Sequence, residues 1–377
     1  MRVIILGAGL VGKAMALDLA AEPGFEITAV DFRGEPLEEL ARAGVAVVRK
    51  DLSRPAEVSE AVRDYELVIN ALPGFLGFQT LKACLESGKN VVDIAFFPED
   101  PFELDSLAKE KGVTAVVDCG VAPGLSHMLA AYGLNQLDRG RSLLIYVGGL
   151  PVVRQWPFEY KAVFSPYDVI EEYLRPARFR ENGHLVIKPA LSDPEFIEFE
   201  KLGTLEAFNT DGLRTLLKTL DVPNMKEKTL RYPGHREKMA ILKEAGFFGT
   251  EPVEISGQRI RPIDFTAKVL FSRLKLNPGE EDLTVMRVMV SGEKSGQNRT
   301  LIYDLFDRFD RKTGIHSMAR TTGYTATMVA RAMARGLIKK TGVVAPEYLG
   351  FDRECLKFVV TGLKNKGLSI EERIETI

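Results

Sequence analysis

The chain has 377 residues, enough for two domains of ordinary size that each bury a core. Its 50 Lys and Arg residues against 52 Asp and Glu leave a formal net charge of −2, so no global basic field favours nucleic acid or an anionic membrane. No apolar run reaches the roughly 18 residues that a membrane-spanning helix needs. The three cysteines are too scattered for a disulfide framework or a metal site. We therefore expect a cytoplasmic protein with no metal, no nucleic-acid partner and no membrane segment.

The first apolar run, VIILGAGLVG at 3–12, leads through three glycines into a helical pattern. Gly7 permits a tight strand-to-helix turn, Gly9 lets the backbone approach a pyrophosphate, and Gly12 allows close packing of the helix on the strand. The helix N-terminus then faces the negative charge of the phosphates. The next apolar run ends in Asp31, where a carboxylate can accept hydrogen bonds from the adenosine ribose. Packing alone can also explain a glycine-rich turn, but the combination predicts a dinucleotide site.

A unit of strand, turn and helix repeats through the first 120 residues. Six strands that alternate with helices predict a doubly wound parallel sheet of the Rossmann type, with ligands at the carboxyl ends of the strands. The expected strands are 3–6, 26–30, 45–48, 67–71, 90–94 and 113–117. The cofactor-binding residues predicted from these strand ends and the glycine turn are Gly7, Gly9, Leu10, Val11, Gly12, Asp31, Asp51, Ala71, Leu72 and Pro73.

The alternation of strands and helices ends after Leu134. The strand-like runs beyond it lack short crossover helices and predict a mixed or antiparallel sheet. The expected strands are 143–148, 283–290 and 300–307, and the expected helices are 167–173, 211–220, 236–245, 263–274 and 325–335. We expect a Rossmann domain over 1–122, an α+β domain for substrate binding and oligomerisation over 123–320, and a C-terminal helical segment over 321–377 that packs back on the first domain. The tail from Leu363 is expected to be a surface helix or disordered. A broad second sheet favours a homodimer or a higher homo-oligomer.

Two segments carry residues suited to substrate chemistry. In DCGVAPGLS at 118–126, Pro123 suits a first helical turn, so we expect an exposed helix N-terminus able to bind a carboxylate. A domain-boundary turn that needs glycine and proline for its shape explains this segment equally well. In KTLRYPGH at 228–235, Arg231 offers a planar fork for a carboxylate, and His235 titrates near neutrality. Taken alone, His235 is as readily a surface residue at a helix start.

These motifs together resemble the saccharopine dehydrogenase/reductase-like family over nearly the whole chain. The resemblance is carried by GAGLVG with Asp31, NALPG at 70–74, VVD at 91–93, DCGVAPGLSHMLA at 118–130, TLRYPGH at 229–235 and MARTTGYTATMVARAM at 318–333. The runs GVAPGLS, EYKAVFSPYDVIEEYLRPARF at 159–179, EAFNTDGLRTLL at 206–217 and RYPGH are most similar to the lysine 6-dehydrogenase branch. Saccharopine reductases typically carry an Asp in GLDPG and an aromatic residue after RYxG, where this chain has Ala122 and His235.

The resemblance implies an NAD-dependent oxidative deamination of the ε-amino carbon of L-lysine to the semialdehyde. An amine must be neutral before hydride leaves its carbon, so a base is needed, with His235 the first candidate and Asp93 the second. Arg231, together with the helix start after Ala122, is expected to hold the α-carboxylate. The residues expected at the substrate are Gly120, Val121, Ala122, Pro123, Gly124, Tyr160, Lys161, Arg231, Tyr232 and Thr322.

The cofactor prediction depends on Asp31, whose carboxylate repels a ribose 2′-phosphate and favours NAD. Arg33, two residues later, makes NADP possible. Two other functions stay open. One is a saccharopine or carboxyspermidine-type reductase acting on a secondary amine, for which Arg154, Arg175 and Arg178 offer a second carboxylate clamp. The other is a dinucleotide-binding sensor without catalytic activity.

Overall fold

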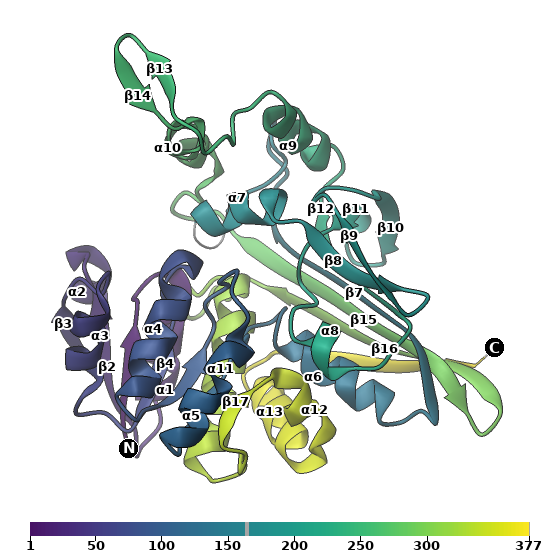
Figure 1. Ribbon diagram of the computed structural model, residues 1–377, viewed down its shortest axis with the longest axis horizontal. Helices are drawn as coiled ribbons and strands as arrows, with labels where there is room; N and C mark the ends of the chain where they lie inside the picture. Colours follow the sequence, from purple (N-terminus) through teal and green to yellow (C-terminus); the bar gives the residue numbers. More distant parts are fainter. Residues whose placement is uncertain (163–165, 377) are drawn as a thin grey trace. The chain divides into compact units, whose positions relative to one another are not determined.

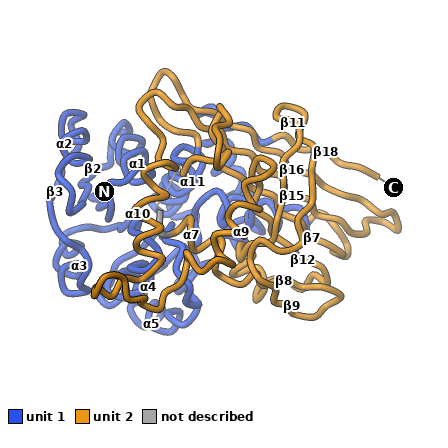
Figure 2. The backbone as a smooth tube through the Cα atoms, turned by 90° about the horizontal axis from the view of Figure 1, so that it is seen from above, with its two compact units in different colours: residues 1–135, 318–370 blue, residues 136–317, 371–377 orange. Residues whose placement is uncertain are grey.

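The computed structural model describes residues 1–162 and 166–376, and the side chains of all of these except residues 166 and 167. The chain divides into two compact units, shown in different colours in Figure 2. Unit 1 comprises residues 1–135 and 318–370, and unit 2 comprises residues 136–317 and 371–377. The first unit thus runs past Ala122, where we placed the domain boundary, and takes in most of the C-terminal segment.

Unit 1 contains a parallel sheet in the order β17-β6-β5-β4-β1-β2-β3 (Figure 1). This confirms the doubly wound sheet predicted from the alternation of strands and helices. Its strands are β1 (Arg2–Leu6), β2 (Glu26–Asp31), β3 (Ala46–Arg49), β4 (Leu67–Asn70), β5 (Asn90–Asp93), β6 (Thr114–Val116) and β17 (Gly342–Val344). Its helices are α1 (Leu10–Ala20), α2 (Gly34–Arg42), α3 (Pro55–Val62), α4 (Gly74–Glu86), η1 (Pro101–Leu104), α5 (Asp105–Glu110), α6 (Leu125–Leu134), α11 (Ser317–Ala334), α12 (Pro346–Phe351) and α13 (Arg353–Asn365).

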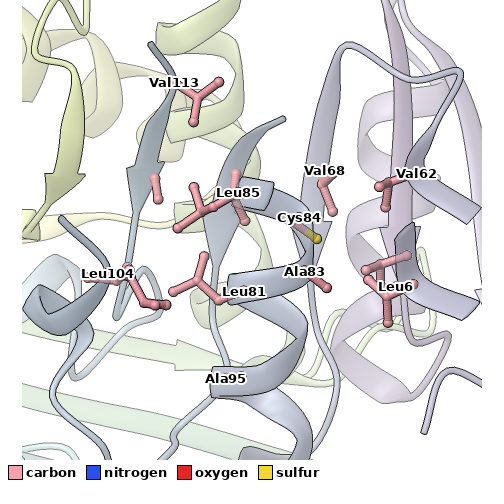
Figure 3. Packing of buried hydrophobic residues seen from close by; sticks show 14 of the residues in the cluster. Leu6, Val62, Val68, Leu81, Ala83, Cys84, Leu85, Ala95, Leu104 and Val113 are labelled. Atoms are coloured by element: carbon pink, nitrogen blue, oxygen red, sulfur yellow. The ribbon is translucent and has the colours of Figure 1, made fainter. Parts of the chain in front are cut away.

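The core of unit 1 forms where α4 packs against the sheet (Figure 3). Leu81 and Leu85 of α4 are fully buried, and Val68 of β4 belongs to the same apolar cluster. Full burial of one such leucine contributes about 2 kcal/mol. This packing fixes the strands from whose carboxyl ends the predicted cofactor residues project.

The C-terminal segment adds both helices and a strand to unit 1. Strand β17 pairs in parallel with β6, which sequence patterning missed. Helix α11 contacts α1 through polar groups, since Thr327 donates to Asp18 at 2.5 Å and Nη1 of Arg331 lies 2.7 Å from the same carboxylate. Unit 1 is therefore completed by residues far along the chain.

Unit 2 contains a mixed sheet in the order β10-β11-β12-β7-β15-β16-β18, with β8 paired to β12 and β9 paired to β8. Strands β7 and β12 are parallel, whereas β7, β15 and β16 are antiparallel, as the mixed-sheet prediction allowed. Its strands are β7 (Arg139–Pro151), β8 (Ala177–Glu181), β9 (His184–Lys188), β10 (Glu195–Phe199), β11 (Gly203–Asn209), β12 (Asn224–Arg231), β15 (Asp282–Lys294), β16 (Gln297–Arg308) and β18 (Ile370–Thr376), with a separate hairpin of β13 (Val253–Ile255) and β14 (Gln258–Ile260). Its helices are α7 (Pro166–Leu174), α8 (Leu216–Thr219), α9 (His235–Glu244) and α10 (Pro262–Leu274).

Two local predictions need correction. The helix expected over 211–220 is reduced to α8, because Arg214 adopts a left-handed conformation with φ of 42° that interrupts a helix. The tail from Leu363 ends α13 and then forms β18 at the edge of the second sheet, rather than a surface helix or a disordered end. No helix among the described residues is long and apolar enough to cross a membrane.

Candidate functional site

The glycine turn of unit 1 leaves space where a dinucleotide needs it. A Cβ atom on Gly12 would lie 1.9 Å from the carbonyl oxygen of Gly7, and one on Gly7 would lie 2.7 Å from the carbonyl oxygen of Ala71. Neither position has room for a side chain. On Gly9, the nearest atom to an added Cβ is Nη2 of Arg33 at 3.7 Å, so the backbone of Gly9 can be approached closely. This arrangement fits the pyrophosphate of a dinucleotide at the start of α1.

The predicted strand-end residues differ in where they lie. The backbone N–H of Ala71 donates to Leu6, and that of Leu72 donates to the side chain of Asn70, which places both beside the glycine turn. Pro73 directly precedes α4. Asp51 is exposed and accepts a hydrogen bond from the backbone of Ser53 at 2.9 Å, so it caps a local turn. Its contact with a cofactor stays a prediction.

Asp93 is fully buried at the end of β5. Its Oδ2 accepts a hydrogen bond from Nδ2 of Asn70 at 2.8 Å, and its Oδ1 accepts one from the backbone of Ala95 at 2.7 Å. These bonds tie the ends of β4 and β5 together. The carboxylate therefore links the two strand ends, and its action as a base stays a prediction.

The expected carboxylate site at the start of α6 is wrong in one respect. The helix begins at Leu125, after Pro123, and its first N–H groups are already used: those of Leu125 and Ser126 donate to the carbonyls of Gly120 and Val121 at 2.9 Å. Both residues are fully buried, so the helix does not present an exposed N-terminus. The turn does bring Thr322 of α11 beside Gly120, because a Cβ on that glycine would lie 3.2 Å from Cγ2 of Thr322.

A buried polar cluster lies in unit 2 around Arg231, the last residue of β12. Its Nη2 donates to Oε2 of Glu172 on α7 at 2.6 Å, and its guanidinium carbon lies 4.4 Å from the ring centroid of Tyr160. The next residue of α7, Tyr173, and the first residue of α9, His235, complete it. We call these five residues the Arg231 cluster.

His235 is fully buried, so a surface residue at the helix start is excluded. Its Nδ1 lies 2.6 Å from the carbonyl oxygen of Phe158, a contact that requires a proton on Nδ1. Its Nε2 then accepts a hydrogen bond from the hydroxyl of Tyr173 at 2.9 Å. Burial, reinforced by the positive charge of Arg231, lowers the pKa of His235 to about 3. The imidazole is therefore neutral, and its Nε2 faces the hydroxyl of Tyr173.

Two donors of the Arg231 cluster have no hydrogen-bond partner among the described residues. These are Nε of Arg231 and the hydroxyl of Tyr160, and the two side chains are only 2% exposed. Burial raises the pKa of Tyr160, so the hydroxyl keeps its proton, and burial also raises the pKa of Glu172. Buried donors without a partner are rare and destabilising, so the cluster is suited to receive an acceptor.

Two predicted pocket residues lie apart from this cluster. Tyr232 directly follows the end of β12 but packs in the apolar cluster with Leu230, on the side of the sheet opposite Arg231, and its hydroxyl donates to the carbonyl of Pro151 at 3.0 Å. Lys161 pairs with Glu280 at 3.2 Å. The structure does not bring either side chain to Arg231.

Sequence reasoning missed a polar stripe along β12. Glu227, Thr229 and Arg231 stand at every second position of β12, so they share one face of the strand. Glu227 is buried and its Oε2 accepts hydrogen bonds from the hydroxyl of Thr210 at 2.7 Å and from the backbone of Gly212 at 3.2 Å. Burial raises the pKa of Glu227 to about 7. The period of two in KEKTLR was the available signal.

A second group of charges surrounds Asp211, which accepts two hydrogen bonds from the guanidinium of Arg178 at 2.8 and 2.9 Å. Burial and the charge of Arg214 lower the pKa of Arg175, whereas the charge of Asp211 opposes this. Unit 2 thus concentrates guanidinium groups near one carboxylate. Among the described residues, no group of His, Cys, Asp and Glu side chains is arranged to hold a metal ion.

The parallel sheet, the glycine turn and Asp31 define a dinucleotide-binding unit, joined in one chain to a mixed-sheet unit with a buried cationic cluster. Residues 3–116 match the saccharopine dehydrogenase NADP binding domain, and residues 120–368 match the saccharopine dehydrogenase C-terminal domain. The chain belongs to the saccharopine dehydrogenase family, as the sequence motifs suggested.

Relatives of this chain are distant in sequence. It is 24% identical to bovine alpha-aminoadipic semialdehyde synthase over 97% of the chain, but spans only 47% of that relative, about half its length. It is 25% identical to carboxyaminopropylagmatine dehydrogenase from Synechocystis, with 96% of each chain covered. The fold matches the solved apo saccharopine dehydrogenase (L-Glu forming) from Saccharomyces cerevisiae with a TM-score of 0.80 at 20% identity, covering 99% of each chain.

Proposed function

We propose that this chain uses NAD(P) to oxidise a carbon–nitrogen bond of an amino acid, specifically by oxidative deamination of the ε-amino group of L-lysine. The observation that carries the proposal is the pair of buried donors, Nε of Arg231 and the hydroxyl of Tyr160. A carboxylate accepts hydrogen bonds from both, and hydrogen bonds to a charged acceptor are the stronger kind. An amino-acid substrate supplies that carboxylate. Unit 1 supplies the dinucleotide-binding residues.

The proton work is assigned to Tyr173 and His235. An ammonium group must lose a proton before its carbon gives up hydride to the nicotinamide. The Tyr173 hydroxyl already donates to Nε2 of His235, so a proton passes from the amine to that hydroxyl as the hydroxyl proton passes to the imidazole. A carboxylate bound at Arg231 offsets the positive charge that helps to lower the pKa of His235, which makes the imidazole a better acceptor.

A second candidate function is the oxidation or formation of a secondary amine. The guanidinium groups of Arg175, Arg178 and Arg214 near Asp211 would suit a second carboxylate, which lysine lacks and a conjugate such as saccharopine carries. Relatives named saccharopine dehydrogenase and carboxyaminopropylagmatine dehydrogenase favour this alternative. Ala122 and His235 favour the lysine reaction instead, because they stand where saccharopine reductases typically carry an Asp and an aromatic residue.

One experiment separates these functions. The protein is incubated with NAD or NADP and with lysine, ornithine, saccharopine or a diamine, while NADH or NADPH formation is recorded. Lysine-dependent reduction of the cofactor without any 2-oxoacid supports deamination. Turnover only with saccharopine, or only in the reductive direction with an amine and a 2-oxoacid, supports the second candidate. Dinucleotide binding without turnover of any of these compounds supports a sensor.

The role of His235 is tested in the active reaction. His235→Ala should lower turnover by about 100-fold or more if the imidazole takes the proton. Glu244→Ala, an exposed change at the end of the same helix, is the matched control and should leave turnover unchanged. Near-normal turnover of folded His235→Ala would remove the imidazole from the mechanism.

A further inference from the structure

The carboxylate of Asp31, at the end of β2, has all its acceptor positions in use. Its side chain is only 5% exposed. Oδ2 accepts hydrogen bonds from the backbone of Ala8 and from Nη2 of Arg33, each at 2.9 Å. Oδ1 accepts hydrogen bonds from the backbone and from Nε of Arg33, at 2.9 and 3.0 Å. A carboxylate offers about four acceptor positions.

Two of the four acceptor positions of Asp31 are occupied by the side chain of Arg33, which can move away. The two backbone donors are fixed, one in the glycine turn and one at the start of α2. The other two come from the guanidinium of Arg33, one on each carboxylate oxygen, and the Arg33 side chain is 50% exposed. The two hydroxyls of the adenosine ribose in NAD need one acceptor position each. Arg33 therefore occupies the positions that this diol requires.

Positive charge also gathers at this strand end. Nη2 of Arg33 lies 3.7 Å from the position of a Cβ on Gly9, so the guanidinium overhangs the glycine turn. Nη1 of Arg49 lies 3.9 Å from the position of a Cβ on Gly34, the first residue of α2. Two guanidinium groups thus flank the turn between β2 and α2. An arginine fork binds a phosphate through two parallel hydrogen bonds, and the 2′-phosphate of NADP is such a group.

We propose that Arg33 selects the cofactor, because it covers Asp31 and must be displaced by the ribose diol of NAD, but binds the 2′-phosphate of NADP. The chain then accepts both cofactors, and the competition between Asp31 and the phosphate for Arg33 sets their ratio. Burial alone would raise the pKa of Asp31, but the hydrogen bonds and charge of Arg33 outweigh burial and lower the pKa below its usual value. The pair is therefore charged at neutral pH. This inference concerns the dinucleotide-binding unit and does not depend on the lysine reaction.

The test uses two fragments that contain only the adenosine end of each cofactor. Binding of 5′-AMP and of adenosine 2′,5′-bisphosphate is measured by calorimetry to the full chain and to Arg33→Ala. We expect Arg33→Ala to bind 5′-AMP several-fold more tightly, because Asp31 is uncovered, and the bisphosphate about tenfold or more weakly. Arg33→Lys keeps the charge without the fork and should fall between the two. Arg42→Ala, an exposed change at the end of α2, should alter neither affinity.

Two results would overturn the inference. One is an unchanged ratio of the two affinities in Arg33→Ala, which would show that the guanidinium does not distinguish the cofactors. The other is weaker binding of 5′-AMP by both Arg33→Ala and Arg33→Lys, which would show that Arg33 holds the adenosine rather than covering Asp31. Because neither fragment carries a nicotinamide, these outcomes are independent of any turnover, and failure of the lysine reaction would leave the binding result intact.

Discussion

The burial of His235 predicts a specific pH dependence of stability. The imidazole is neutral in the folded protein, with a pKa of about 3, and regains a value near 6.5 when the chain unfolds. Since the folded pKa is lower, the unfolded chain binds more protons, and stability is lost as the pH falls below about 6.5. Integrated from about pH 7.5 to pH 5, this single group removes about 2 kcal/mol from the free energy of unfolding.

Glu227 acts in the opposite direction. Burial raises its pKa to about 7, whereas the unfolded carboxyl titrates near 4.5. Its contribution is full below the unfolded pKa and is lost as the pH rises through about 7, so acidification over the same range stabilises the fold by about 2 kcal/mol. The two groups offset one another in the unmodified protein. A pH scan of that protein alone would hide both.

The assay therefore compares variants rather than one curve. His235→Gln keeps a donor for Phe158 and an acceptor for Tyr173 but does not titrate. Glu227→Gln likewise replaces the carboxyl by an amide of similar shape that does not titrate. Urea unfolding is measured for the unmodified chain and for each variant at about pH 7.5 and pH 5. The gap is the free energy of unfolding of the unmodified chain minus that of the variant. On acidification it should fall by about 2 kcal/mol for His235→Gln, and it should rise for Glu227→Gln. A gap for His235→Gln that stays constant would refute the buried, neutral imidazole.

Three further predictions follow from single contacts. Gly12→Ala should destabilise the chain by about 2 kcal/mol or more, because its Cβ meets the carbonyl of Gly7 at 1.9 Å, whereas Gly9→Ala should melt normally and bind NADH about tenfold or more weakly. Arg231→Met should cost about 1–3 kcal/mol in urea unfolding because it leaves Glu172, whose side chain is 22% exposed, without its partner, and adding Glu172→Gln should restore part of this. Tyr173→Phe should destabilise the fold by about 1–3 kcal/mol, because it leaves Nε2 of His235 without a partner, while lowering turnover as strongly as His235→Ala, and full turnover would exclude the relay.

Local patterning was enough to predict the first six strands of the parallel sheet. Each is a short apolar run followed by a turn and a helix, and the structure places β1 to β6 within a residue or two of the expected ranges. Strand β17 has only three residues and pairs with β6 from the distant C-terminal part of the chain. Strand β18 reads as a charged tail, since its residues are mostly exposed. Such pairings depend on tertiary contacts that no local window contains.

Local sequence patterns predicted the backbone features of the site better than the contacts between its side chains. The glycine turn and Asp31 are readable because backbone geometry dictates the residue type at each position. The start of α6 was misjudged because the preceding turn supplies its own carbonyl acceptors, which depends on a fold-back of Gly120 onto Gly124. The partner of Arg231 was also invisible, since Glu172 lies on another element and carries no local signal. The sequence indicated an arginine fork but not the acid that occupies it.

That acid leads to a last prediction about the Arg231 cluster. Glu172 occupies Nη2 of Arg231, so a substrate carboxylate at Nε brings a second negative charge to the same guanidinium. Burial already raises the pKa of Glu172, and the added charge raises it further, so binding should take up a proton. L-Norleucine carries the α-carboxylate of lysine without its ε-amine and is a suitable probe. Calorimetry in buffers of different ionisation enthalpy should show more proton uptake on binding by the unmodified chain than by Glu172→Gln. Equal uptake in both proteins would place the carboxylate elsewhere than on Arg231.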